Sequence, residues 1–243
     1  MSFNDFKKQS TKTNVKGSVS NIEKKFWDFL EKSDKTNEFP KYGSGIEKSL
    51  CPKKQPYWNF QQLGSLLSNL KDTRGHAREI SGINKSWLYL GSYSSLFIAH
   101  CEDYDFPGIN FLHSGKSKIW YGVPPAYHNK FEEMCQNIWP EQFKKCPAFL
   151  RHKEFMVAPH ILKENGVPYY RVEQKEGEIV VVAPSAYHFG FNSGWNIAEA
   201  VNFANLRWLP FGEKAVNCHC KIKYKFSDKY SFEDLLKGFG IKK

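Results

Sequence analysis

The stretch IAHCEDYDFPGINFLHSGKSKIWYGVPP, residues 98–125, decides the fold because strand-like apolar runs are mixed in it with polar side chains. Short aliphatic and aromatic runs between turn signals are typical of strands. A core strand seldom carries many polar groups, since burying one without a partner costs free energy. The stretch therefore predicts strands whose polar groups face either water or a bound molecule. Its polar side chains include His100, Glu102, Asn110, His113, Lys118 and Trp120.

The composition is that of a chain with a sizeable core. The 243 residues are 41% hydrophobic and 16% aromatic, which suits one large domain or two small ones. The longest apolar runs, such as residues 179–184, have the length of a strand and not of a membrane span. The N-terminus shows no apolar signal segment, so we expect a soluble protein of the cell interior and no membrane partner.

The net charge of +10 suggests a polyanionic partner. Lysines are concentrated near the two ends, which either contact DNA or chromatin or are solvated tails. The sequence shows no stripe of interleaved aromatic and basic residues of the kind that binds single-stranded nucleic acid. The lysines concerned are Lys7, Lys8, Lys12, Lys16, Lys221, Lys223, Lys225, Lys229, Lys237, Lys242 and Lys243.

Helices are predicted on either side of a β-rich centre. Residues 1–19 are polar with little pattern, so we expect a tail there. A capping box, Ser20 and Glu23, opens a predicted helix over residues 20–33, and residues 59–72 show the same helical spacing. Further predicted helices lie within residues 124–136, 141–152, 159–166 and 232–240.

Short β-rich runs fill the centre from residue 87 onward. The sequence shows no βαβ alternation and no glycine-rich phosphate loop. The pattern favours an antiparallel sandwich or barrel of the jelly-roll type, whose mouth can hold a small ligand. The predicted strands lie within residues 87–92, 95–100, 108–113, 118–123, 177–184, 187–192 and 196–204.

Two histidines and a glutamate occur directly beside these runs. Residues i and i+2 of a strand face the same side, so His100 and Glu102 would converge. His188 follows another apolar run. Two histidines and one carboxylate form the facial triad of non-heme Fe(II) oxygenases. The spacing alone is a weak signal, because a hydrogen-bonded His–Glu pair at a strand end fits it as well.

Lys118 strengthens the oxygenase interpretation. It precedes the apolar run IWYGVPP, where a buried ammonium would need an anion. An oxygenase that uses 2-oxoglutarate needs a cation for the far carboxylate of that cosubstrate, and Asn110 could donate a hydrogen bond to the same molecule. A lysine whose ammonium reaches solvent at the rim fits the sequence equally.

Two longer segments, residues 100–125 and residues 187–212, resemble the catalytic core of the Jumonji C (JmjC) histone lysine demethylases. CPAFLRHK, residues 146–153, and CHC, residues 218–220, resemble the subfamily that combines a JmjN segment with the JmjC domain. The resemblance covers roughly residues 82–220, with a fainter match from Tyr42. It implies a mainly β fold, a double-stranded β-helix of the jelly-roll or cupin type, with flanking helices and a small zinc-bound C-terminal segment.

The resemblance also implies roles for individual residues. The residues that match Fe(II) ligands are His100, Glu102 and His188. The residues that match contacts to 2-oxoglutarate are Tyr42, Phe97, Asn110, Lys118 and Trp120. The residues that match the surroundings of the substrate methylammonium are Gly82, Tyr89, Glu102 and Asn202.

Cys146, His152, Cys218 and Cys220 match structural zinc ligands, and their chemistry fits a closed Cys₃His site. Without the resemblance, reduced thiols would be the default interpretation of the CHC pattern, with a metal site as the alternative. We accordingly expect a basic tail and helical linker over residues 1–41, the catalytic barrel over 42–205, and the zinc-bound segment over 206–243. No role is assigned to Cys51, Cys101 and Cys135, expected to be ordinary thiols, or to His113, His128, His160 and His219, expected to be structural or surface residues.

The activity that the resemblance implies is Fe(II)- and 2-oxoglutarate-dependent demethylation of tri- and dimethyl-lysine on histone H3 tails, with release of formaldehyde and succinate in the nucleus. A JmjC protein hydroxylase and a catalytically silent JmjC scaffold on chromatin are the alternatives. Three features depart from the family. Residues 1–41 show no convincing JmjN segment, Ala200 stands where some members have serine, and Trp87 stands where tyrosine is usual.

Overall fold

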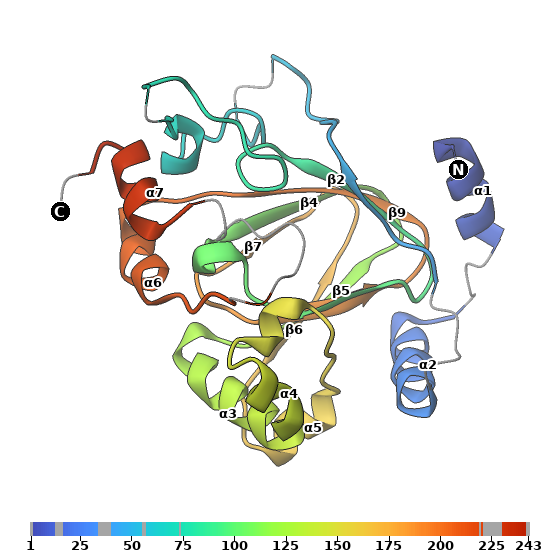
Figure 1. The fold of residues 1–243 in the computed structure, drawn as a ribbon. Coiled ribbons are helices and arrows are strands. Elements are labelled where there is room, and N and C mark those ends of the chain that lie inside the picture. Colours follow the sequence, from blue (N-terminus) through green and yellow to red (C-terminus); the bar gives the residue numbers. More distant parts are fainter. Residues whose placement is uncertain are drawn as a thin grey trace.

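Two antiparallel β-sheets form the centre of the protein, and helices lie around them (Figure 1). The computed structural model describes residues 2–12, 17–33, 40–54, 57–72, 74–218, 220 and 230–241. Within these residues the predicted mainly β, jelly-roll architecture is confirmed. None of the described helices is long and apolar enough to cross a membrane.

The larger sheet has five strands and the smaller sheet has four. In spatial order the larger sheet contains β1 (Gly43–Ile46), β2 (Trp87–Gly91), β9 (Asn196–Asn202), β4 (Gly108–Gly115) and β7 (Ile179–Val182). The smaller sheet contains β3 (Leu96–His100), β8 (His188–Asn192), β5 (Lys118–Gly122) and β6 (Tyr170–Gln174). Every pairing is antiparallel, so residues far apart in the chain meet across each sheet.

The alternation of side chains along β8 separates a polar interior from an apolar exterior. His188 and Asn192 face the space between the sheets, whereas Phe189 and Phe191 belong to the apolar core on the other side. Gly190 lies between the two polar residues. A Cβ there would stand 1.9 Å from the carbonyl oxygen of Ile119, so the close approach of β5 requires glycine.

Helices cover the outer face of the smaller sheet. Phe26 of α2 (Val19–Lys32) stacks on Phe191 with ring centroids 4.1 Å apart, and the indole of Trp27 donates a hydrogen bond to the Tyr121 hydroxyl at 2.9 Å. The same apolar core includes Phe131, from the group of helices seen below β5 and β6 in Figure 1. These helices are α3 (His128–Ile138), α4 (Pro140–Lys145) and α5 (Pro159–Glu164).

A second apolar cluster joins the C-terminal helices to the barrel. Trp208, at the end of the 3₁₀ turn Leu206–Trp208, stacks on Phe106 at 4.5 Å and donates its indole N–H to the carbonyl oxygen of Tyr104 at 2.8 Å. Leu235 of α7 packs into the same cluster. The two C-terminal helices are α6 (Leu209–Lys214) and α7 (Phe232–Gly238).

The structure corrects two helix predictions and adds three elements. Residues 3–12, expected in a tail, form α1 (Phe3–Lys12), whose Phe6 is buried near Leu88 and Leu90. Residues 59–72 contain only the 3₁₀ turn Leu66–Asn69, because Gly64 has a φ of +65°, which no α-helix contains. Helix α2 has Ser18 and not Ser20 as its N-cap. β1 and β6 were not predicted.

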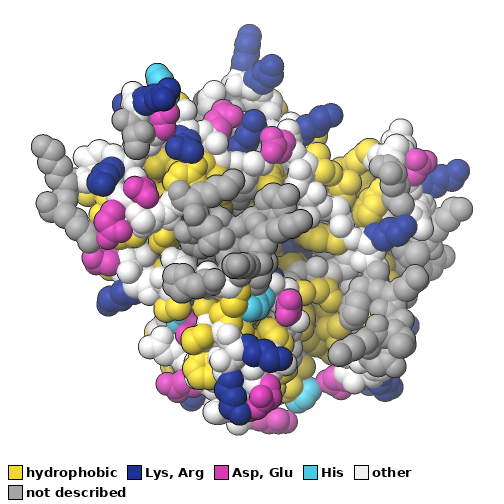
Figure 2. Space-filling view, in the orientation of Figure 1, with side chains coloured by type: hydrophobic (Ala, Val, Ile, Leu, Met, Phe, Trp, Pro, Cys, Tyr) yellow, Lys and Arg dark blue, Asp and Glu magenta, His cyan; other side chains and the backbone are white. Residues whose placement is uncertain are grey.

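Charges of both signs are interspersed on the face shown in Figure 2, where Lys and Arg side chains lie among Asp and Glu. Most of the terminal lysines singled out in the sequence, including Lys16, Lys221, Lys223, Lys225 and Lys229, lie outside the described residues. The prediction that the ends contact DNA stays a prediction.

The packing of α2 on the barrel predicts a stability difference between two phenylalanines of that helix. Phe26→Ala should lower the free energy of unfolding by about 3–5 kcal/mol, since its ring is buried against Phe191. Phe29→Ala is the matched control, because Phe29 is 37% exposed. Chemical denaturation measures both, and equal losses would contradict this packing.

Candidate active site and metal centres

Three metal-binding side chains meet at one end of the space between the sheets. His188 begins β8, and His100 ends β3 opposite it. The pairing of β3 with β8 is irregular between Phe97 and His100, so both of these side chains face the interior although they are three residues apart. Glu102 lies just beyond the strand, as the N-cap residue of the 3₁₀ turn Asp103–Asp105. The predicted convergence therefore comes from a bulge and a turn.

The three side chains present only hydrogen-bond acceptors to one another. His100 Nδ1 lies 2.6 Å from the carbonyl oxygen of Ile98, and His188 Nδ1 lies 3.0 Å from that of Ala186. These contacts place the ring proton on Nδ1 and leave each Nε2 with a lone pair. The two Nε2 atoms stand 3.7 and 3.3 Å from Glu102 Oε1. A cation is the partner that such a group requires.

The electrostatics of the group suit a divalent metal. Burial, with smaller contributions from Lys153 and His188, lowers the pKa of His100 to about 4, so its imidazole is neutral at pH 7. Two neutral imidazoles and one carboxylate are the ligands that Fe(II) oxygenases use.

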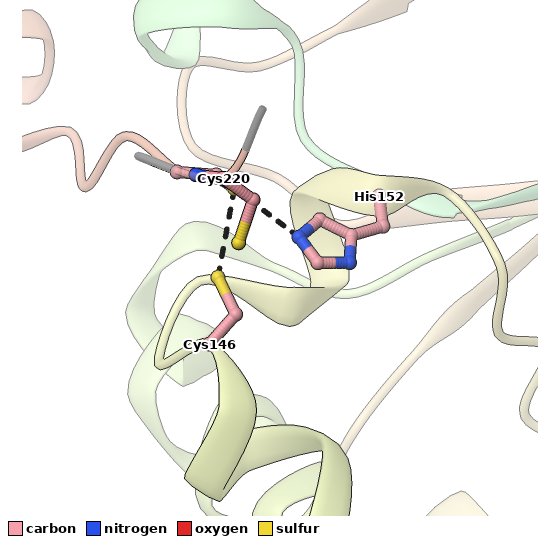
Figure 3. A group of neighbouring side chains, drawn as sticks. Cys146, His152 and Cys220 are labelled. Atoms are coloured by element: carbon pink, nitrogen blue, oxygen red, sulfur yellow. Dashed lines mark hydrogen bonds between the residues drawn. The ribbon is translucent and has the colours of Figure 1, made fainter. Parts of the chain in front are cut away.

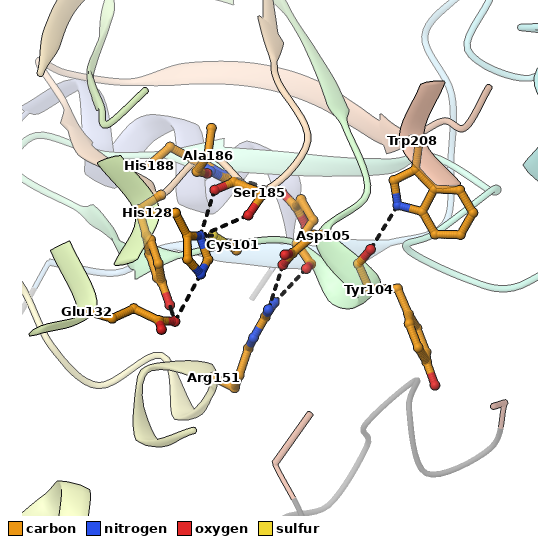
Figure 4. A network of polar contacts seen from close by, with 12 residues as sticks. Cys101, Tyr104, Asp105, His128, Glu132, Arg151, Ser185, Ala186, His188 and Trp208 are labelled. Atoms are coloured by element: carbon orange, nitrogen blue, oxygen red, sulfur yellow. Dashed lines mark hydrogen bonds and ion pairs between the residues drawn. The ribbon is translucent and has the colours of Figure 1, made fainter. Parts of the chain in front are cut away.

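Arg151 fixes the backbone that carries Glu102. Its guanidinium donates one hydrogen bond to the carbonyl oxygen of Glu102 at 2.8 Å. It also pairs with Asp105 at 2.5 Å (Figure 4). Tyr104 and Asp105, which follow Glu102 in this turn, have φ values of 48° and 53°. This left-handed conformation is uncommon for residues other than glycine. The arginine thus stabilises a tight turn that aims Glu102 at the two histidines.

Lys118 lies deep in the same cavity and is 1% exposed. Its ammonium donates a hydrogen bond to Asn192 Oδ1 at 2.8 Å and lies 4.8 Å from the Phe97 ring, 5.4 Å from the Tyr42 ring and 5.9 Å from the Trp120 ring. Among the residues that the structure describes it pairs with no carboxylate. Burial lowers its pKa to about 7, so a bound anion would be needed to keep it charged.

Asn110 adds an unsatisfied polar atom to the cavity wall. Its Oδ1 is buried and has no hydrogen-bond partner within the described part of the chain. Trp120, across the cavity, has its indole N–H satisfied by Gln174 at 2.9 Å. Buried polar atoms are nearly always paired, so Asn110 is placed to contact something that the cavity binds.

The remaining predicted residues line this cavity as well. Tyr42 and Tyr89 stack with ring centroids 6.0 Å apart. Gly82 has a φ of +78°, and a Cβ there would stand 2.9 Å from the Trp87 ring. Asn202 directs its amide nitrogen toward the carbonyl oxygen of Pro107 at 3.4 Å. The structure thus brings all eleven residues predicted for iron, cosubstrate and substrate into one cavity, although their roles rest on chemistry and not on a bound ligand.

A second group of metal-binding side chains lies outside the barrel. Cys146, His152, Cys218 and Cys220 have ligand atoms that all lie within 4.8 Å of one another. Cys218 Sγ stands 3.5 Å from Cys146 Sγ and 3.1 Å from His152 Nε2. Figure 3 shows Cys146, His152 and Cys220 pointing toward one another. Burial and the neighbouring Cys218 and Cys220 thiols raise the pKa of Cys146 to about 12. A metal ion is what would favour the thiolates in such a group.

A family model described as "JmjC domain, hydroxylase" matches residues 87–203, which contain both histidines, the glutamate and Lys118. This chain is a JmjC-domain protein. It is 40% identical to Lysine-specific demethylase 4D of Rattus norvegicus over 199 residues, which are 82% of this chain and 38% of that relative. Probable lysine-specific demethylase 4F of Homo sapiens is 39% identical over 201 residues, 83% of this chain and 30% of the relative.

Lysine-specific demethylase 4B of Mus musculus is 38% identical over 200 residues, 82% of this chain and 18% of that relative. The chain therefore spans well under half the length of these curated relatives. The matched residues extend beyond the JmjC model, so the likeness includes parts of the chain that flank the barrel. The predicted resemblance to the JmjC lysine demethylases is confirmed.

Two residues that support the JmjC site were not predicted. Asn192, which accepts the hydrogen bond from Lys118, lies on the same face of β8 as His188, and that spacing was a usable signal. Arg151 could not be found by any strand or helix pattern, because it reaches Glu102 from the 3₁₀ turn Phe149–His152, far away in the sequence.

The role of Arg151 predicts a loss of iron affinity on substitution. Arg151→Met should weaken Fe(II) binding by about 10–100-fold, because the turn that aims Glu102 loses its anchor. Arg171→Met is the control, since Arg171 also pairs with a carboxylate, Glu23, at 2.7 Å but on the outside of the smaller sheet. Anaerobic calorimetry with Fe(II) measures both affinities. Equal affinities in the two variants would contradict the role of Arg151.

Proposed function

We propose that this JmjC protein is an Fe(II)- and 2-oxoglutarate-dependent oxygenase that removes methyl groups from tri- and dimethyl-lysine of histone H3 tails. The observation that carries the proposal is the cavity itself. Three acceptors converge at one end of it, and farther in lies a buried ammonium that pairs with no carboxylate of the described residues. A metal cation and a dicarboxylate together satisfy both needs.

His100, Glu102 and His188 would hold the iron through two Nε2 atoms and one carboxylate oxygen. They supply three ligands, which leaves positions for a cosubstrate and oxygen. The hydrogen bonds of both Nδ1 atoms to backbone carbonyls keep the rings in the orientation that ligation requires. When bound, the iron with 2-oxoglutarate and O₂ supplies the oxidising power that hydroxylates a methyl C–H bond.

Lys118 would bind the far carboxylate of 2-oxoglutarate, with Asn192 holding the ammonium in place. Asn110, which lines the same cavity, would donate a hydrogen bond from its amide N–H to the same molecule. The rings of Tyr42, Phe97 and Trp120 surround the ammonium and exclude water from it. Excluding water strengthens the pairing of ammonium and carboxylate.

Gly82, Tyr89, Glu102 and Asn202 would surround the methylated ammonium of the substrate. Their oxygen atoms can accept weak hydrogen bonds from the polarised methyl C–H groups. Hydroxylation of a methyl group needs no lone pair on the nitrogen, so trimethyl-lysine is a possible substrate. The hydroxymethyl group then leaves as formaldehyde. Trp87, which lies over Gly82, narrows the approach and is suited to influence substrate choice.

Cys146, His152, Cys218 and Cys220 would hold a structural zinc ion. The first two come from the region around α4 and the last two follow α6, so the metal would join the C-terminal segment to the helical insertion. We accordingly divide the chain into a basic, partly helical segment over residues 1–41, the catalytic barrel over 42–205 and the zinc-bound segment over 206–243. A histone substrate places the protein in the nucleus on chromatin, with the basic ends as DNA contacts.

Mass spectrometry of methylated histone-tail peptides tests the activity. With Fe(II), ascorbate and 2-oxoglutarate, the protein should remove one CH₂ per turnover from a trimethyl-lysine peptide and form succinate. His188→Ala should abolish both, whereas His160→Ala should not, since His160 is an exposed residue that pairs with Glu31 at 3.5 Å. A product that keeps one added oxygen would identify a hydroxylase, the activity in the family description, and would refute demethylation.

The pKa of Lys118 predicts proton uptake on binding of 2-oxoglutarate. Its pKa of about 7 makes the free amine largely neutral at about pH 8, and a bound carboxylate favours the charged form. Uptake should therefore grow as the pH rises through about 7 and vanish well below it. Calorimetry in buffers of different ionisation enthalpy, with Ni²⁺ in place of iron, measures it. Lys118→Arg should show none, because arginine stays protonated. Equal uptake by both proteins would contradict the assignment.

A further inference from the structure

We infer that Cys51, His113 and Glu199 form another metal-binding site, for a soft divalent cation of the zinc class, on the outer face of the larger sheet. Their ligand atoms, one per residue, all lie within 4.8 Å of one another. The sequence had suggested no role for the cysteine or the histidine. The inference does not depend on the proposed demethylase activity, because none of the three residues lines the iron cavity.

The site lies on the side of the sheet opposite to the iron cavity. His113 comes from β4 and Glu199 from the neighbouring strand β9, while Asn110 and Ala200 of the same strands face the cavity. His113 Nε2 stands 2.8 Å from Glu199 Oε2, and Cys51 Sγ stands 3.8 Å from the same oxygen. One carboxylate oxygen is thus approached by both an imidazole nitrogen and a thiol.

Glu199 is oriented by the protein before any metal arrives. Its side chain is 0% exposed, yet it is a carboxylate in an apolar neighbourhood that includes Phe111 and Val201. Its Oε1 accepts a hydrogen bond from the Ser86 hydroxyl at 2.6 Å, and its Oε2 accepts one from the Leu50 N–H at 3.0 Å. Such supporting hydrogen bonds are typical of carboxylates that ligate metals.

A surface cleft gives access to the site. The cleft has a volume of about 270 Å³, and both Cys51 and His113 line it together with apolar side chains that include Trp58 and Phe111. Three protein ligands beside an open cleft leave a fourth position for water or an exogenous ligand. The Cys₃His group differs, since its four side chains suffice for a closed tetrahedral site.

The ligand types select the metal. A thiolate beside an imidazole favours zinc and its softer neighbours over magnesium or calcium, which prefer oxygen ligands alone. Binding would release the thiol proton of Cys51 to solvent and move the ring proton of His113 from Nε2 to Nδ1. The hydrogen bond of His113 to Glu199 would be replaced by two bonds to the metal. It would also attach the segment that follows β1 to the centre of the larger sheet.

Cobalt absorption distinguishes this site from the other two. The full chain is first given one equivalent of Zn²⁺ to occupy the Cys₃His group and is then titrated with Co²⁺. A thiolate-to-cobalt charge-transfer band should appear in the near ultraviolet. The iron ligands contain no sulfur, so cobalt bound there adds nothing to that band. Cys51→Ser should lose the band, and His113→Gln should weaken cobalt binding at least about tenfold.

Cys135→Ala is the control, because it removes a buried thiol that belongs to none of the ligand groups in the described residues. It should keep the band. Cys51→His should lose the band but bind one more zinc ion per chain than Cys51→Ser, because histidine can replace the lost ligand. This variant separates loss of a ligand from loss of the fold. The melting temperature of each variant shows whether it folds. An unchanged band in Cys51→Ser, or no band in the wild-type protein at saturating Co²⁺, would overturn the inference.

Discussion

The interior of this JmjC barrel holds charged and polar groups that its described residues do not satisfy. The ammonium of Lys118 is buried without a carboxylate partner, and two imidazole nitrogens face the carboxylate of Glu102 without a donor between them. Burying such groups costs free energy unless a cation and an anion accompany them. On the outer face of the smaller sheet, Phe191 of β8 packs on Phe26 of the helix α2 and stabilises the barrel from that side.

The two predicted metal groups of the JmjC protein are connected through a short segment. Arg151, which holds the carbonyl oxygen of Glu102, directly precedes His152 of the Cys₃His group. A metal at the Cys₃His group would fix the 3₁₀ turn that carries both residues. The iron ligands would then depend on the zinc group through one guanidinium, in addition to any effect of zinc on the C-terminal segment.

The sequence predicted which residues come together in the cavity more accurately than it predicted the backbone geometry that brings them together. His188, which follows an apolar run in the sequence, lies at the start of β8. His100 and Glu102 converge through a bulge and a left-handed turn that no period-two pattern contains. Arg151 was missed because its partner Glu102 is distant in the sequence, whereas the spacing of Asn192 from His188 along β8 was a usable signal. The helix expected over residues 59–72 fails at Gly64, where backbone conformation outweighs apolar spacing. Propensity cannot locate the cleft beside Cys51, since tertiary packing creates it.

The most direct test of the central claim is anaerobic absorption spectroscopy of the protein with Fe(II) and 2-oxoglutarate. Chelation of iron by the keto acid in the cavity gives a visible charge-transfer band. The account predicts that wild-type protein shows this band, that Glu102→Ala lacks it, and that Lys118→Met needs a much higher 2-oxoglutarate concentration to reach it. A wild-type protein without the band, or a Lys118→Met protein with unchanged 2-oxoglutarate dependence, would contradict the account.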